Sequence, residues 1–286
     1  MGRPNRRTSH LGMAAITTCD APADGILLRS SQGGIALPND VEDFFSRHAE
    51  GYAASQSHKA GQDLALLTDL LEPGPTDRLV DIAAGTGHTA LHLRGRIADA
   101  VLVDLTPKML AEARRLAEER GLAITTLVAD AVAVPLADAS FTLATCRRAA
   151  HHFPDVPAFL AEAHRLLAPG GKLGISDMTA DDAAIGLLNR IERLRDASHR
   201  SALSPNVWRR AVEAAGFTVE ALEIEQEDYS LMRWLSPASP EEVDLPAIEE
   251  TLRSASPEER DALRIREEQD GLHLVKSRAV LLALRG

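Results

Sequence analysis

The segment Asp81 to Gly87, which reads Asp-Ile-Ala-Ala-Gly-Thr-Gly, constrains the fold of this chain more than any other segment. It ends an apolar run, residues 78–83, that has the length of a buried strand, and it precedes a helical pattern that reaches Leu93. Glycine is needed where the backbone turns tightly and a ligand approaches the main chain closely. The N–H groups at the start of the helix are free to bind that ligand. The segment therefore predicts a strand–turn–helix unit with a ligand-binding turn.

Strand and helix patterns alternate along the residues that follow. Apolar runs typical of buried strands cover residues 100–105, 124–129, 141–146 and 172–176. Helical patterns lie between them at residues 107–120 and 156–167. Regular alternation of this kind indicates a parallel sheet with helices on both faces. We therefore expect an α/β fold built on a Rossmann-like, mostly parallel sheet.

The segments on either side differ from this region. Residues 1–40 carry scattered Gly, Pro and Ser without a period, which predicts a flexible N-terminal arm. Helical periodicity begins at residue 41, so we assign residues 41–180 to the ligand-binding domain. Residues 181–286 are expected to be mostly helical. They should form a C-terminal cap and complete the sheet with a strand at residues 217–224.

Composition excludes several classes of partner. The formal net charge of −11 disfavours nucleic acid, because an acidic surface repels phosphate backbones. No apolar run reaches the roughly 18 residues of a membrane span. The two cysteines, Cys19 and Cys146, provide neither a disulfide framework nor the ligand spacing of a zinc site. We therefore expect no metal, and free thiols favour a cytoplasmic location.

Two aspartates stand at the ends of predicted strands. Asp104 lies 19 residues beyond Gly85, where a carboxylate can accept hydrogen bonds from the ribose hydroxyls of an adenosine-type cofactor. Asp130 follows the next strand and can accept a hydrogen bond from an adenine amino group. The alternatives are a helix cap for Asp104 and a loop residue for Asp130. Both lie with the glycine turn at the carboxyl edge of the sheet, where α/β folds bind ligands.

Taken in order, these segments resemble the class I S-adenosylmethionine (SAM)-dependent methyltransferases, of the UbiE-like, methyltransferase domain 11 kind. The resemblance covers about residues 42–178 and is carried by residues 81–87, 103–110, 129–131, 139–141, 146–155 and 165–171. It implies a sheet of seven strands with helical N-terminal and C-terminal cap segments, SAM as cofactor and S-adenosylhomocysteine (SAH) as product. Residues 41–180 are then the SAM-binding domain.

The resemblance also implies roles for individual residues. Those expected to bind the cofactor are Asp81, Ala83, Gly85, Gly87, Asp104, Leu105, Met109, Asp130, Ala131 and Arg147. Ala83 stands where many relatives have glycine, and we expect its small side chain to fit. The competing interpretation of the glycine turn is a nicotinamide dehydrogenase. The third glycine of that motif is replaced by Ala90, which the motif tolerates, but Asp130 would have no role there.

Candidate substrate residues follow the strand at 141–146 or belong to the flanking segments. SAM carries an activated methyl group, so the protein mainly positions the reactants, and a base is needed only if the acceptor loses a proton. His151 and His152 are the catalytic candidates, since histidine accepts a proton near neutral pH. The alternative is that one of them serves only in packing or as a helix cap. The residues expected to face the acceptor, or else solvent, are Tyr52, His58, Arg148, Asp177, Arg195 and His199.

The resemblance implies methyl transfer from SAM to oxygen, nitrogen or activated carbon of a small-molecule acceptor. Only four of the 31 basic residues are lysine, which suggests a GC-rich bacterial source and a quinone-like or secondary-metabolite acceptor. Two alternatives stay open because a fold does not determine a function. One is a cyclase or rearrangement enzyme of natural-product biosynthesis in which SAM is structural, and the other is a non-catalytic SAM sensor. A homodimer is also left open.

Overall fold

The computed structural model describes residues 16–18, 39–236 and 243–286. Most of the segment for which a flexible arm is expected, including Cys19, therefore lies outside the described residues. Residues 16–18 of that segment form strand β1 (Ile16–Thr18), which pairs antiparallel with β4 (Thr125–Val128). Within the described part of the chain, every helix is too short or too polar to cross a membrane.

One sheet organises the molecule, with the strand order β1-β4-β3-β2-β5-β6-β9-β7 and β8 paired to β9 alone. The remaining strands are β2 (Arg78–Ile82), β3 (Asp99–Asp104), β5 (Phe141–Arg147), β6 (Leu167–Thr179), β7 (Phe217–Ser230), β8 (Arg266–Glu268) and β9 (Gly271–Arg285). Strands β4, β3, β2, β5 and β6 are parallel, and β9 runs antiparallel to both β6 and β7. The predicted seven-stranded, mostly parallel sheet is confirmed, with β1 and β8 as short additions.

The helices follow the sheet in chain order. Helices α1 (Asn39–Ala54), α2 (Gln56–Ala60) and α3 (Gln62–Leu71) precede β2, and α4 (His88–Leu93), α5 (Pro107–Glu119) and α6 (Val156–Leu166) connect parallel strands. After β6 come α7 (Ile185–Arg195), α8 (Pro205–Ala214), α9 (Leu231–Leu235), α10 (Leu245–Arg253) and α11 (Pro257–Ala262). Several helices begin with a side-chain cap. The carboxylate of Asp155 accepts a hydrogen bond from Ala158 N–H, and Ser204 Oγ accepts one from Val207 N–H.

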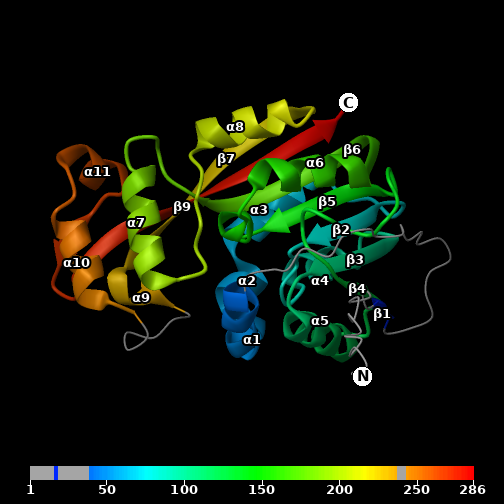
Figure 1. Ribbon diagram of the computed structural model, residues 1–286, viewed down its shortest axis with the longest axis horizontal. Helices are drawn as coiled ribbons and strands as arrows, with labels where there is room; N and C mark the ends of the chain where they lie inside the picture. Colours follow the sequence, from blue (N-terminus) through cyan, green and yellow to red (C-terminus); the bar gives the residue numbers. More distant parts are fainter. Residues whose placement is uncertain (1–15, 19–38, 237–242) are drawn as a thin grey trace, which may run out of the picture.

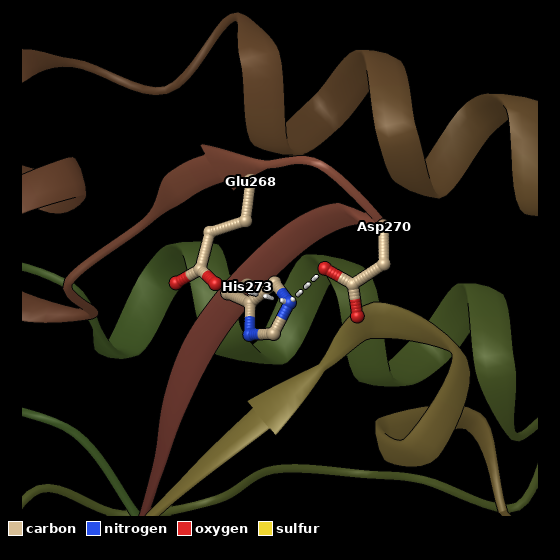
Figure 2. A group of neighbouring side chains, drawn as sticks. All are labelled: Glu268, Asp270 and His273. Carbon is tan, nitrogen blue, oxygen red and sulfur yellow. Dashed lines mark hydrogen bonds and ion pairs between the residues drawn. The ribbon is translucent and has the colours of Figure 1, made fainter.

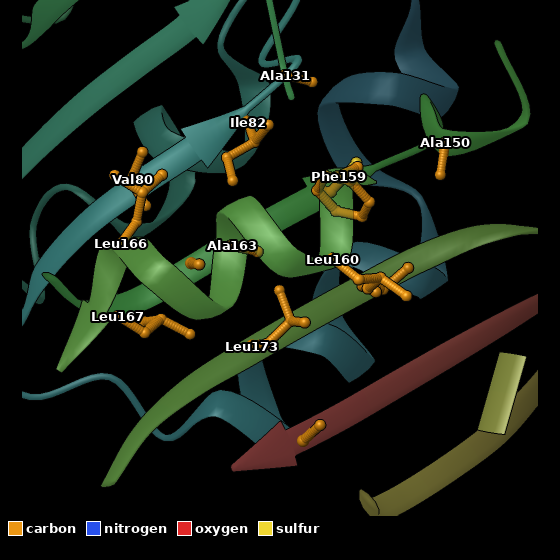
Figure 3. Close-up of a cluster of buried hydrophobic side chains, with 14 of the residues drawn as sticks. Val80, Ile82, Ala131, Ala150, Phe159, Leu160, Ala163, Leu166, Leu167 and Leu173 are labelled. Carbon is orange, nitrogen blue, oxygen red and sulfur yellow. The ribbon is translucent and has the colours of Figure 1, made fainter. Parts of the chain in front are cut away.

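Apolar side chains bury both faces of the sheet. Helices α6 and α8 cover one face, and Figure 3 shows α6 lying over the strands with Phe159, Leu160 and Leu173 in the interface. Helices α3, α4 and α5 cover the other face, where Leu67 and Leu110 pack against the strands. The two-sided burial explains why the strands read as continuous apolar runs. It also leaves the carboxyl edge of the parallel strands free for a site.

The C-terminal residues divide between the sheet and a separate helical lobe. Figure 1 shows α7, α9, α10 and α11 gathered at one end of the molecule, with β9 running from this lobe along the sheet. The lobe has its own core, which includes Leu187, Trp234 and Ile248. The expectation that residues 181–286 are mostly helical was wrong, because β7 and β9 are long strands. Lys276 and Arg278 interrupt the apolar pattern of β9 and conceal it in the sequence.

Candidate functional site

The turn after β2 has the backbone geometry that its glycines permit. Gly85 and Gly87 have φ angles of 53° and 77°, and Ala83 also has a positive φ of 53°, which is uncommon for alanine. A Cβ on Gly85 would meet no atom within 4 Å, whereas a Cβ on Gly87 would lie 2.7 Å from Leu102 Cδ2. Gly85 therefore leaves space for a ligand, and Gly87 allows α4 to pack closely against β3.

Asp104 joins the glycine turn to the start of α5. Its Oδ2 accepts a hydrogen bond from Gly85 N–H at 2.7 Å, and its Oδ1 accepts one from Thr106 N–H at 2.8 Å. Burial raises the pKa of this carboxyl group, and the backbone N–H donors partly oppose that shift. Because a carboxylate oxygen accepts more than one hydrogen bond, Asp104 can also bind a ligand hydroxyl.

The buried carboxylate of Asp81 holds the turn to the neighbouring strand and helix. Thr145 Oγ1 donates to its Oδ1 at 2.7 Å, and Ala90 N–H donates to its Oδ2 at 3.3 Å, so the carboxylate links β2 to β5 and α4. Burial outweighs these donors and raises the pKa of Asp81 to about 6. The side chain lines neither of the two cavities described next, so the geometry gives Asp81 a positioning role.

A cavity at the carboxyl edge, called cavity 1 here, collects most of the predicted cofactor residues. Those that line it are Ala83, Gly85, Asp104, Leu105, Met109, Asp130, Ala131 and Arg147. Asp81 and Gly87 do not line it. Asp130 holds the loop after β4 by accepting from Val132 N–H through Oδ1 at 3.1 Å. The side chain of His88 also lines this cavity, and its buried Nδ1 has no hydrogen-bond partner among the described residues.

A buried carboxylate that the sequence patterns did not single out organises the centre of the site. Asp63 of α3 accepts from the guanidinium groups of Arg147 and Arg148, at 2.7 Å and 2.6 Å, and from Ser176 Oγ at 2.9 Å. Burial opposes ionisation, but the two guanidinium groups hold the pKa of Asp63 well below its usual range. An acid on the apolar face of a helix was the available signal for this residue. The cluster fastens α3 to the ends of β5 and β6.

A second cavity, cavity 2, of about 500 Å³ borders cavity 1. The two cavities share five lining residues, which are Phe45, Tyr52, His58, Arg148 and His152. His151, Asp177 and Arg195 line cavity 2 alone. A volume of this size suits a small molecule. The shared boundary places any occupant of cavity 2 next to an occupant of cavity 1.

His151 and Asp177 form a buried pair in the wall of cavity 2. His151 Nδ1 lies 2.5 Å from Asp177 Oδ1, and His151 N–H donates to Oδ2 at 2.8 Å. Burial opposes ionisation of the carboxyl group, but His151 lowers the pKa of Asp177 below its ordinary value. An imidazole that donates from Nδ1 keeps the lone pair of Nε2 for accepting a proton. The pair thus has the arrangement of a base oriented by a carboxylate.

The boundary side chains are less suited to proton transfer. Burial, reinforced by His151, lowers the pKa of His152 to about 3, so this imidazole stays neutral near pH 7. Its ring meets Phe45 edge to face, with centroids 5.0 Å apart. Burial also raises the pKa of Tyr52 to about 12 and lowers that of His58 well below its ordinary value. These residues shape the passage between the cavities.

One residue predicted to face the acceptor lies outside both cavities, and β9 adds charged side chains to cavity 2 that were not predicted. His199 lines neither cavity, because its Nε2 is 2.7 Å from Asn189 Oδ1 and the side chain is buried behind α7. His199 was predicted to face the acceptor, and the structure places it outside both cavities. Lys276 and Arg278 of β9 line cavity 2. Charges within an apolar run were their only signal in the sequence.

A separate acidic cluster lies at the turn between β8 and β9. Figure 2 shows Glu268, Asp270 and His273, whose ligand atoms lie within 4.8 Å of one another. His273 Nε2 is 2.9 Å from Asp270 Oδ1, and Arg266 pairs with Glu268 at 2.6 Å. The carboxylates are exposed and these contacts account for their positions, so the cluster gives no basis for a metal site.

The comparisons with known proteins match the region of the chain that contains this site. The family model Methyltransf_11, described as a methyltransferase domain, matches residues 80–175. The uncharacterized methyltransferase YcgJ of Bacillus subtilis is 35% identical over 167 residues, which cover 57% of this chain and 66% of YcgJ. The demethylmenaquinone methyltransferase of Thermus thermophilus is 42% identical over 124 residues, which cover 42% of this chain and 56% of that protein.

Two further similarities extend over more of the matched protein. The uncharacterized protein YafE of Escherichia coli is 32% identical over 167 residues, which cover 57% of this chain and 81% of YafE. The crystal structure of YcgJ superposes with a TM-score of 0.73 at 28% identity, covering 79% of this chain and 99% of YcgJ. By sequence, the chain spans between half and two thirds of the first three curated relatives that it matches.

Proposed function

The chain belongs to the Methyltransf_11 family of methyltransferase domains, and on that premise we propose that it transfers a methyl group from SAM to a small-molecule acceptor. When bound, SAM supplies an activated methyl group, so the protein has to orient two molecules rather than activate the methyl carbon. The two adjoining cavities support this division, with cavity 1 for SAM and cavity 2 for the acceptor.

The residues of cavity 1 fit SAM. Asp104 would hold the ribose, since its two oxygens keep acceptor capacity beyond their backbone hydrogen bonds. Asp130 and Ala131 would hold the adenine edge, and the open space over Gly85 would admit the methionine part. The unpartnered Nδ1 of His88 offers a further polar contact to the ligand.

The observation that carries the catalytic proposal is the hydrogen bond between His151 and Asp177 in the wall of cavity 2. We infer that His151 Nε2 accepts the proton that a hydroxyl, amine or activated C–H group of the acceptor loses. Asp177 stabilises the imidazolium that forms and holds the ring in one orientation, as a carboxylate does for histidine bases generally. His152 is neutral, and its Nδ1 is already hydrogen-bonded to Ser198 Oγ at 3.0 Å, so it serves as part of the passage between the cavities.

Two relatives suggest the kind of acceptor. Their names describe a demethylmenaquinone methyltransferase and a ubiquinone/menaquinone biosynthesis C-methyltransferase, which act on quinone-type rings. A hydroxylated aromatic acceptor for this chain would place an acidic hydroxyl or an activated ring carbon near His151. This choice rests on similarity over about half of each relative.

Calorimetric titration with SAM and SAH tests the first half of the proposal. We expect the native protein to bind both ligands. Asp104→Ala should bind them at least tenfold more weakly, because it loses charge-assisted hydrogen bonds to the ligand. A screen of hydroxylated aromatic compounds for SAH release then tests the second half. Product formation without SAH would favour a cyclase with structural SAM, and binding without any turnover would favour a SAM sensor.

A further inference from the structure

Charged side chains of cavity 2 come from β6, β9, α7, α9 and the segments that follow β5 and α7. The cationic residues that line the cavity are Arg148, Arg195, Arg233, Lys276 and Arg278, and the carboxylates are Asp177 and Asp196. Such an excess of cations can bind an anionic ligand only if some of the cations have no partner inside the protein. Their contacts therefore decide what the cavity can bind.

Each of the four arginines already pairs with a carboxylate, although Arg148 shares its carboxylate with Arg147. The pairs are Arg148 with Asp63, Arg195 with Glu192, Arg233 with Glu227 and Arg278 with Glu225. The two lining carboxylates are also engaged, Asp177 by His151 and Asp196 by Ser198. These pairs leave little net charge for a ligand.

Lys276 differs from the other cations of the wall. Among the described residues its Nζ donates no hydrogen bond, and the nearest carboxylate oxygen is Glu192 Oε1 at 3.8 Å. Only 12% of the Lys276 side chain is exposed, so water does not fully replace the missing partner. Glu192 gives its other oxygen to Arg195, at 2.8 Å. Within the described parts of the chain, Lys276 is thus a largely buried ammonium group with no acceptor at hydrogen-bond distance.

The surroundings of Lys276 destabilise its charged form. Burial, with the guanidinium groups of Arg195, Arg278 and Arg148, lowers the pKa of Lys276 to about 7, although Glu192 opposes this. On the neighbouring strand, Glu227 pairs in register with Lys276, but its carboxylate is bound by Tyr229 and Arg233. A negative charge in the cavity would supply the hydrogen bonds and the field that the protein does not.

We propose that cavity 2 binds the carboxylate of a monoanionic acceptor, and that Lys276 Nζ is the group that anchors it. The inference rests on the proposed function, because it assigns cavity 2 to the acceptor. Lys276 Nζ donates no hydrogen bond among the described residues, so one ligand carboxylate can supply the missing acceptor. The lining carboxylates Asp177 and Asp196 disfavour a doubly charged phosphate. The acceptor is then a small hydroxylated acid. Its carboxylate lies toward β9 and α7, and its reacting atom lies toward His151.

The ionisation of Lys276 itself provides the test. The chain has four lysines, so NMR spectra of ¹³C- or ¹⁵N-labelled lysine are simple, and Lys276→Met assigns the signal. Titration of SAH-loaded protein with saturating benzoate should raise the midpoint for Lys276 by about one pH unit or more. Benzamide, which has nearly the same shape without the charge, should leave it unchanged. No change with benzoate, or an equal change with benzamide, overturns the proposal.

Calorimetry gives an independent readout. Benzoate should bind SAH-loaded native protein at least tenfold more tightly than benzamide, and at pH 8 it should bind with proton uptake. Lys276→Met should abolish both effects, Lys276→Arg should keep the preference without the uptake, and Lys172→Met, a distant lysine on β6, should resemble the native protein. A benzoate preference that survives in Lys276→Met contradicts the assignment. Failure of the proposed function appears separately, as absence of SAH binding before any benzoate is added.

Discussion

His151 Nδ1 and Asp177 Oδ1 lie 2.5 Å apart, and both side chains are buried. Asp177 comes from the end of β6 and His151 from the turn after β5, so the sheet itself brings the two groups together. Backbone N–H groups of His151 and Met178 also donate to the carboxylate, which fixes its orientation. The pair therefore presents the imidazole to cavity 2 in one defined position.

Removal of the base should reduce turnover and leave cofactor binding intact. We expect His151→Gln to lower kcat on a hydroxylated acceptor by about 10² to 10⁴-fold, the range for loss of a general base. Asp177→Asn should also lower kcat, because the amide no longer stabilises the imidazolium. SAH affinity by calorimetry should stay within twofold of native. His164→Gln, a partly exposed histidine outside both cavities, is the control, and unchanged kcat in His151→Gln would disprove the base assignment.

The two glycines of the turn should respond differently to the same substitution. Gly87→Ala forces a Cβ to 2.7 Å from Leu102 Cδ2 at a φ of 77°, so we expect a loss of about 1–3 kcal/mol in unfolding free energy. Gly85→Ala meets no protein atom and should cost only about 1 kcal/mol, but its methyl group enters the space assigned to SAM.

Urea unfolding and SAH titration separate these two effects. Gly85→Ala should weaken SAH binding more than Gly87→Ala does, and Gly87→Ala should be the less stable protein. Equal SAH affinity of Gly85→Ala and native protein would show that the ligand does not approach the main chain at this turn.

Asp63 should be required for stability because it is the carboxylate that two buried guanidinium groups share. Asp63→Asn leaves Arg147 and Arg148 without a carboxylate, and breaking a buried charge cluster in this way costs about 3–5 kcal/mol. Asp69→Asn on the exposed side of α3 is the matched control and should change stability by less than about 0.5 kcal/mol. Chemical denaturation measures both. A small effect of Asp63→Asn would mean that the arginines find water or other acceptors.

The pH dependence of stability should reveal Asp81. Burial raises its pKa to about 6 in the folded protein, above the ordinary value of 3.8, so ionisation favours the unfolded chain. The stabilising effect of the protonated form is complete below about pH 4 and is lost as pH rises through 6.

Asp81→Asn removes this titration, so its stability relative to native should improve by up to about 3 kcal/mol between pH 4 and pH 7.5. Denaturation curves at several pH values give this difference directly. Asp69→Asn, which removes an exposed carboxylate, should show almost none of it. If the stability difference between Asp81→Asn and native protein did not change with pH, Asp81 would have its ordinary pKa in the folded protein.

Local sequence patterns predicted much of the fold and many of the residues that line cavity 1. The turn at 81–87, the strand ends at Asp104 and Asp130 and the capped helices depend on neighbouring residues, which the sequence displays directly. The strand β9 was missed because its partners β6 and β7 are distant in sequence, and Lys276 and Arg278 break its apolar pattern. Their charges are tolerated because they face cavity 2 rather than the core.

The sequence by itself determined the kind of fold and the edge at which a cofactor would bind, because strand periodicity and glycine turns are properties of short segments. Only the tertiary structure decided which side chains meet: Asp63 with Arg147 and Arg148, His151 with Asp177, and Lys276 with Glu192 at 3.8 Å, beyond hydrogen-bond distance. His199 was one of the residues predicted to face the acceptor, but its Nε2 lies 2.7 Å from Asn189 Oδ1 and it lines neither cavity. Burial and partnering of charges depend on packing between distant segments, and no local pattern encodes that packing.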